Sequence, residues 1–109
     1  MMQMKLLLIV CTLLVAASAV EASDALEKMA TVFVGNYSRA EIKAELDSVL
    51  RLHGMPRSEE NYSRSGSVLV SLRKSYGVRE MDILSCMKGA GGHGSFPDLA
   101  AICCVTLAE

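Results

Sequence analysis

The sequence predicts a small all-α protein, a bundle of four or five short helices held together by one disulfide. Three observations support this fold class. Apolar residues recur every three or four positions in several segments, as they do on one face of a helix. Serines stand where these segments begin and glycines where several of them end, which is typical of helix caps. No segment shows the sustained two-residue alternation of a half-buried strand.

We interpret residues 1–22 as a signal peptide rather than as part of the folded domain. A single lysine precedes an apolar run from Leu6 to Ala17, and small residues follow it. The run is shorter than the ~20 residues that a membrane-spanning helix needs, although an uncleaved anchor is an alternative. Cleavage after Ala19 and cleavage after Ala22 both fit the pattern. We therefore expect export to the periplasm or the extracellular space, with residues 23–109 as a single small helical domain.

Two helices are predicted in the first half of this domain. Ser23 can cap the first, which ends near Gly35. Ser38 and Glu41 form a capping-box pattern at the start of the second, and Gly54 follows its end. The apolar residues of the two faces are Leu26, Met29, Ala30 and Phe33 in the first helix and Ile42, Leu46, Val49, Leu50 and His53 in the second. We expect His53 to be a packing or C-cap residue.

The segment from Ser58 to Met87 has the most consistent local signals, and it predicts two helices joined by a tight corner. Ser58 can cap the first of them, and Gly77 can end it in a left-handed turn. Gly66 allows two readings. A glycine inside a helix costs about 1 kcal/mol, which a close helix crossing would offset; in the other reading the helix begins only near Ser65 or Ser67, and residues 61–66 are a loop. A last helix follows the glycine-rich loop, with Ser95 as its cap.

The string Asn-Tyr-Ser-Arg occurs twice, at residues 36–39 and 61–64. Each copy precedes an apolar helical run, so a duplicated helical unit could explain it, although chance and shared capping chemistry explain it more simply. Two matched strings fall short of the three or more units that a repeat array requires. Both strings are also N-x-S glycosylation acceptors if the source is eukaryotic.

The cysteines Cys86, Cys103 and Cys104 predict one disulfide in an exported protein. Neighbouring residues on a helix point about 100° apart, so only one of the adjacent pair can face Cys86. Cys103 shares the apolar face of the last helix, so we predict the pair Cys86–Cys103, with Cys86–Cys104 as the alternative. Cys104 would then be buried, or free to form a disulfide-linked dimer.

A competing hypothesis is a metal-binding or thiol-redox protein. Cys86, His93, Cys103 and Cys104 are the soft or borderline ligands that such a site would use. Their spacing matches no known zinc pattern, and Cys103 and Cys104 would have to distort a helix to converge. We therefore expect no metal and no other cofactor.

Charge and motifs narrow the function further. The net charge of −1 argues against a nucleic-acid binder, because such proteins depend on cationic contacts to phosphates. No nucleophile or metalloprotease motif is present, so we expect no enzyme and assign no catalytic residue. Four cationic residues form a modest basic face, either simply solvated or available to an acidic partner: Arg64, Arg73, Lys74 and Arg79. We expect an exported binding or interaction module, with an inhibitor-like role inside that class and a protein partner that the sequence does not identify. No membrane span is expected after cleavage.

Overall fold

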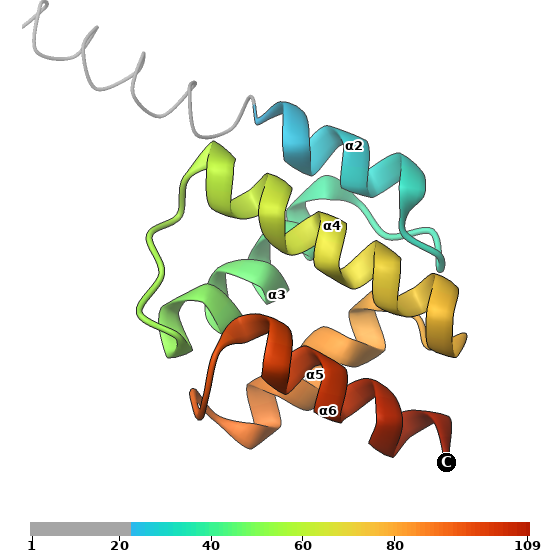
Figure 1. The fold of residues 1–109 in the computed structure, drawn as a ribbon. Helices are drawn as coiled ribbons and strands as arrows, with labels where there is room; N and C mark the ends of the chain where they lie inside the picture. Colours follow the sequence, from blue (N-terminus) through green and yellow to red (C-terminus); the bar gives the residue numbers. More distant parts are fainter. Residues whose placement is uncertain (1–22) are drawn as a thin grey trace, which may run out of the picture.

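The computed structural model describes residues 23–109 (Figure 1). The predicted signal peptide lies outside the described residues. The described part consists of five helices with no strand, so the predicted all-α fold class is confirmed. The helices are α2 (Asp24–Val32), α3 (Arg39–Leu52), α4 (Glu59–Tyr76), α5 (Glu80–Ala90) and α6 (Phe96–Ala108).

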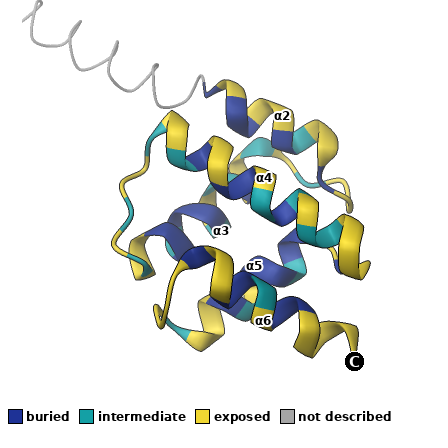
Figure 2. Ribbon diagram, in the orientation of Figure 1, coloured by how far each residue is buried: buried dark blue, intermediate teal, exposed yellow. Residues whose placement is uncertain are grey.

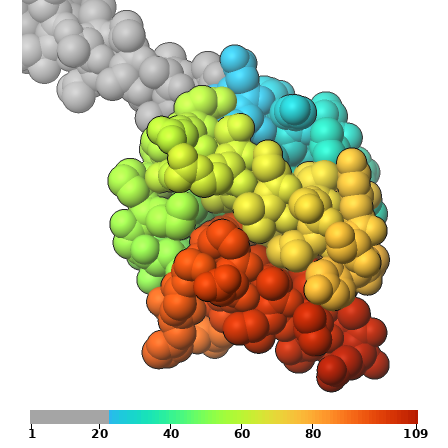
Figure 3. Space-filling model, viewed as in Figure 1, coloured from blue at the N-terminus to red at the C-terminus, as the bar shows by residue number. Residues whose placement is uncertain are grey.

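The long helix α4 lies between α2 on one side and α6 on the other (Figure 1). Helix α3 packs against α2 and α5, while α5 also contacts α4 and α6. Figure 3 shows α4 at the surface, with α2 along one edge and α6 along the other. The helices therefore enclose one apolar core, and the buried sides of all five face it (Figure 2).

Serine caps begin four of the five helices where the sequence predicts them. The hydroxyls of Ser23, Ser38, Ser58 and Ser95 each accept a hydrogen bond from a backbone N–H in the first turn of the helix that follows. The Ser38 cap is a complete capping box, because the Glu41 side chain accepts a hydrogen bond from the Ser38 N–H in return. These contacts satisfy N–H groups that have no partner inside the helix.

The corner between α4 and α5 also forms as predicted. Gly77 adopts a left-handed conformation with φ of 73°, and its N–H donates to the Arg73 carbonyl at 2.8 Å. Such a conformation is strained for any residue with a side chain, so glycine is suited to this position. Val78 follows it and is buried, which turns the chain back toward the core.

Gly66 lies inside a continuous α4, so of the two readings the helix that includes it is correct. A Cβ at this position would lie 2.9 Å from Met29 Cε, which shows how closely α2 and α4 approach each other. The missing side chain therefore permits the crossing that offsets the helical cost of glycine.

The loop between α5 and α6 is fastened to the end of α3. A Cβ on Gly92 would lie 1.9 Å from the Leu52 carbonyl oxygen, so a residue with a side chain cannot occupy this place. His53 is the C-cap of α3, as predicted, and its Nδ1 lies 3.2 Å from the Gly94 carbonyl oxygen. The His53 ring also packs edge-on against Phe96.

The two Asn-Tyr-Ser-Arg strings have different structures. Asn36 lies in the loop before α3 with φ of 59°, whereas Asn61 lies inside the first turn of α4. The Asn61 side-chain amide donates to the Pro56 carbonyl at 2.8 Å. The strings therefore do not mark equivalent positions of a duplicated unit.

Candidate docking groove

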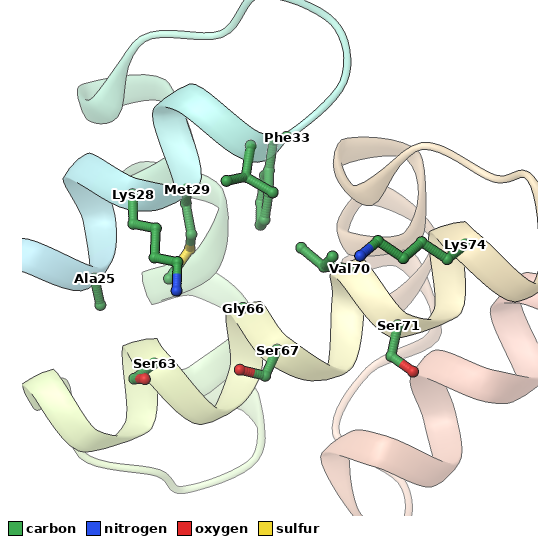
Figure 4. A pocket seen from close by; sticks show the side chains of 11 residues that line it. Ala25, Lys28, Met29, Phe33, Ser63, Gly66, Ser67, Val70, Ser71 and Lys74 are labelled. Atoms are coloured by element: carbon green, nitrogen blue, oxygen red, sulfur yellow. The ribbon is translucent and has the colours of Figure 1, made fainter.

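A groove of about 540 Å³ runs along the surface between α2 and α4 (Figure 4). Helix α2 contributes Ala25, Lys28, Met29, Val32 and Phe33 to its lining, and α4 contributes Ser63, Gly66, Ser67, Val70, Ser71 and Lys74. The lining combines apolar residues with small hydroxyl residues and two cations. It contains no aspartate, glutamate, histidine or cysteine.

The floor of the groove follows from the close helix crossing at Gly66. Met29 and Phe33 fill the angle between the two helices and are almost completely buried. Methionine is flexible and polarizable, and such side chains are common at surfaces that adapt to a partner. The floor is therefore apolar, but these two side chains expose only 4% and 5% of their surface, and the exposed apolar surface of the lining comes mainly from Val32 at 37%.

The α4 wall of the groove is built from small residues. Ser63, Ser67 and Ser71 recur every four positions, so they lie on one face of the helix, and all three are exposed. Gly66 lies beside this stripe. Because none of these side chains is large, little protrudes from this face of α4, and the groove stays open along it.

Two lysines give the groove its charge. Lys28 extends from α2 toward α4, while Lys74 runs back along α4 until its ammonium group lies beside Val70 (Figure 4). Within residues 23–109 neither ammonium group forms an ion pair. The groove is therefore locally positive in a chain whose net charge is only −1.

Three members of the predicted basic face are engaged by carboxylates instead. Arg64 pairs with Glu60 at 2.6 Å on the surface of α4, and Arg79 pairs with Asp82 at 2.9 Å in the first turn of α5. Lys74 is the fourth member, and in the structure it belongs to the groove rather than to a face shared with these arginines.

Arg73 has a structural role. Its Nε donates at 2.8 Å to Glu80, whose side chain is fully buried, and the other Glu80 oxygen accepts from the Val34 N–H at 3.3 Å. A buried carboxylate is tolerated only when its charge and its lone pairs are satisfied. This contact therefore fastens the corner of α4 and α5 to the end of α2.

Cys86 and Cys103 lie at disulfide distance, with their Cα atoms 5.9 Å apart, so the predicted link between α5 and α6 is confirmed. Cys104 is fully buried, and this burial raises the pKa of its thiol. A dimer through Cys104 would require α6 to leave the core, so the structure gives no support to such a link.

The structure does not assemble the hypothetical metal site. His93 is exposed in the loop before α6, Cys86 and Cys103 are joined to each other, and Cys104 points into the core. No group of three or more metal-ligating side chains occurs in the described part of the chain. In the same residues, no helix has both the length and the apolar character to span a membrane.

A buried polar cluster joins α3 to α4, and its geometry is structural. Tyr62 donates to Asp47 at 2.7 Å, and Lys43 donates to the second carboxylate oxygen at 2.7 Å. Burial, and then the hydrogen bond to Asp47, raise the pKa of the Tyr62 hydroxyl. The tyrosine therefore keeps its proton and serves as a hydrogen-bond donor inside the fold.

The groove was not predicted from the sequence, because Lys28 and Lys74 are brought together only by the packing of α2 on α4. One local signal was available. The serines at positions 63, 67 and 71, next to Gly66, form a stripe of small residues, and such a stripe indicates a helix face that no large side chain covers.

Residues 23–109 thus form a small helical bundle with one cysteine pair at disulfide distance and an open groove between α2 and α4. No family model, no curated protein and no solved structure matches this chain.

Proposed function

We propose that the mature chain is an exported interaction module that binds a protein partner through the α2–α4 groove, without a cofactor. The observation that carries this proposal is an apolar groove lining beside two lysines that have no acidic partner among residues 23–109. Charged side chains on a surface often pair with neighbours, as Arg64 and Arg79 do. These lysines, together with Val32, which is 37% exposed in the same lining, are suited to an interface.

The groove lining supports binding rather than catalysis. The serine hydroxyls are the only nucleophiles in it besides the lysines, and activating a serine requires a neighbouring general base. No histidine or carboxylate lines the groove, and the two lysines are exposed and form no hydrogen bond with a groove serine among the described residues. An inhibitor-like role belongs to the same class, because an inhibitor also acts by occupying a partner's surface.

Export is part of the proposal. The apolar run before Ala17 and the Cys86–Cys103 pair both suit a protein that reaches an oxidising compartment. N-terminal sequencing of native protein should begin at Val20 or Ser23. An intact Met1 in a cytosolic fraction would refute this part.

Filling the groove tests the site. Ser67→Trp places an indole over the apolar floor, whereas Ser75→Trp adds the same group on α4 at an exposed position that does not line the groove. Wild type and Ser75→Trp should capture the same partner from the compartment where the protein resides, and Ser67→Trp should not. Equal capture by both variants, with circular dichroism unchanged, would reject the groove as the binding site.

The metal or thiol-redox alternative is not favoured by any contact in the structure. A metal assay on protein purified without chelator separates the two classes. Bound zinc with three free thiols would reverse the assignment.

A further inference from the structure

We propose that the segment that occupies the groove is an acidic amphipathic helix of about three turns, supplied by a partner protein. This inference rests on the proposed function of the groove and names the chemistry of its occupant. It follows from the length, the shape and the charge of the lining.

The length of the groove matches a short helix. Its α4 wall runs from Ser63 to Lys74, which corresponds to about 17 Å at 1.5 Å per residue. A partner helix of three turns covers the same distance. It can place an apolar residue over the floor at each turn, in the way that other helix-binding grooves engage their targets.

The small residues of the wall favour a helix as the occupant. The middle turns of α4 carry the small residues Gly66, Ser67 and Ser71, so no large side chain protrudes from the helix there. A helix backbone can therefore approach α4 closely, while its side chains contact the exposed Val32 and the half-buried Val70 above the floor. The exposed serine hydroxyls remain available to polar groups along its edge.

The charge of the groove favours an acidic occupant. Lys28 lies on the α2 wall and Lys74 lies toward the C-terminal end of the α4 wall, so both walls carry an unpaired cation. No carboxylate lines the groove to neutralise them. Complementary glutamates or aspartates on the partner would contribute to specificity and to the rate of association.

An isolated small anion fits the groove less well. Binding sites for small ligands bury most of the ligand surface. Here the three serines and both lysines of the lining are exposed, so the groove is open along its length. A helix can use such a surface, because it covers the groove with its own side chains.

Two designed peptides test this inference. Each has about 14 residues with leucines along one helical face, and one carries glutamates beside the leucines where the other carries lysines. The mature protein, labelled with ¹⁵N, is titrated with each peptide. The glutamate peptide should shift amide signals of α2 and the groove face of α4, with binding weakened at high salt. The lysine peptide should bind roughly tenfold more weakly or less.

Charge-reversal variants sharpen the test. The double variant Lys28→Glu/Lys74→Glu should reverse the preference, so that the lysine peptide becomes the better ligand. Arg64→Glu is the control, because Arg64 lies on α4 outside the groove lining. This control should retain the preference for the glutamate peptide.

The outcomes distinguish the inference from the proposed function. Groove shifts of equal size with both peptides would overturn the acidic partner and leave the groove as a docking site. No groove shift with either peptide up to about 1 mM would overturn the helical partner, while the Ser67→Trp capture experiment decides the proposed function independently. Groove shifts with laurate alone would replace the helix by a small amphiphilic anion. Groove shifts that depend on protein concentration without any ligand would show that the occupant is a second copy of the chain rather than a partner helix.

Discussion

Two of the helices that contact α4, namely α2 and α6, are held in different ways. Helix α6 buries Phe96, Leu99, Cys103 and Cys104, and the pair Cys86–Cys103 at disulfide distance joins it to α5. On the α2 side, a shorter helix contacts α4 through the Met29–Gly66 crossing and leaves an open groove. Helix α6 is therefore held by apolar burial and a cysteine pair, whereas the packing of α2 on α4 leaves a groove open at the surface.

Polar contacts compensate in part for the smaller apolar contact of α2. Glu59 accepts hydrogen bonds from the Ser23 hydroxyl and from the Ala25 N–H, the latter at 2.7 Å. This carboxylate lies at the positive end of the α2 helix dipole, where negative charge is favourable. At the other end of α2, the Val34 N–H donates to buried Glu80. Helix α2 is therefore fastened at both ends while its middle borders the groove.

The largest expected change in the free energy of unfolding comes from the loss of a core side chain of α4, the helix that contacts both α2 and α6. Leu69 is fully buried in α4. Leu69→Ala should lower the free energy of unfolding by about 2–5 kcal/mol, because it removes apolar contact and leaves a cavity. Ile102→Ala is the control, since Ile102 is 62% exposed on α6. Urea denaturation should show a change within about 0.5 kcal/mol for the control. Equal effects would mean that Leu69 is not a core residue.

The next effect concerns the α6 side alone. Replacing both Cys86 and Cys103 by alanine should lower the free energy of unfolding by about 3 kcal/mol. The disulfide closes a loop of 17 residues and so restricts the unfolded chain. Thermal or urea unfolding measures this loss. Peptide mapping without reduction should show Cys86 joined to Cys103. A Cys86–Cys104 link would contradict the structure.

A smaller effect is expected on the α2 side. Glu59→Gln weakens the carboxylate contacts at the start of α2 and should cost about 1 kcal/mol. Hydrogen exchange should show that α2 amides lose protection before those of α6. Glu60→Gln is the adjacent control, because Glu60 contacts only the exposed Arg64 side chain in a surface pair. Similar losses for both variants would argue against the capping role of Glu59.

Cys104 provides a probe of the α6 side that depends on pH. Because burial raises its pKa, a smaller fraction of this thiol is ionised near pH 8 than of an exposed cysteine. Alkylation of native protein should therefore be slow and should increase only at a higher pH, whereas unfolded protein should react quickly. Rapid modification of native protein at pH 8 would show that α6 opens readily.

The smallest expected change in stability is the difference between alanine substitutions at two helical glycines, Gly89 and Gly66. Gly89 faces open space in α5, so Gly89→Ala should stabilise the protein by about 0.5–1 kcal/mol. At Gly66 the new methyl group would meet the flexible Met29 side chain, which has to move, so Gly66→Ala should stabilise the protein by roughly 1 kcal/mol less than Gly89→Ala despite the same gain in helix propensity. Urea denaturation of both variants measures the difference. Equal stabilisation would mean that Met29 moves aside without cost.

Features that depend on nearby residues could be predicted from the sequence. A serine cap or the left-handed Gly77 needs only its own helix end, and the helical phase of Cys103 selects it over Cys104. The reading of Gly66 could not be decided, because the cost of the glycine is offset by Met29 from a distant segment.

The candidate site was harder to predict than the fold, because it depends on pairing between distant helices. The four residues of the predicted basic face were grouped by their proximity in the sequence. Packing then paired Arg73 with buried Glu80 and placed Lys74 in the lining of the same groove as Lys28. Charges acquire partners only when helices pack, so a count of cations along the chain does not distinguish a paired arginine from a free lysine.

Our central proposal is that a partner binds at the α2–α4 groove and not on α6. The most direct test is hydrogen exchange of the mature protein with and without its captured partner. Amides of α2 and of the groove face of α4 should gain protection on binding, while α6 should remain unchanged because it lies away from the interface. Gained protection on α6 with α2 unchanged would contradict the assignment of the α2 side as the binding surface.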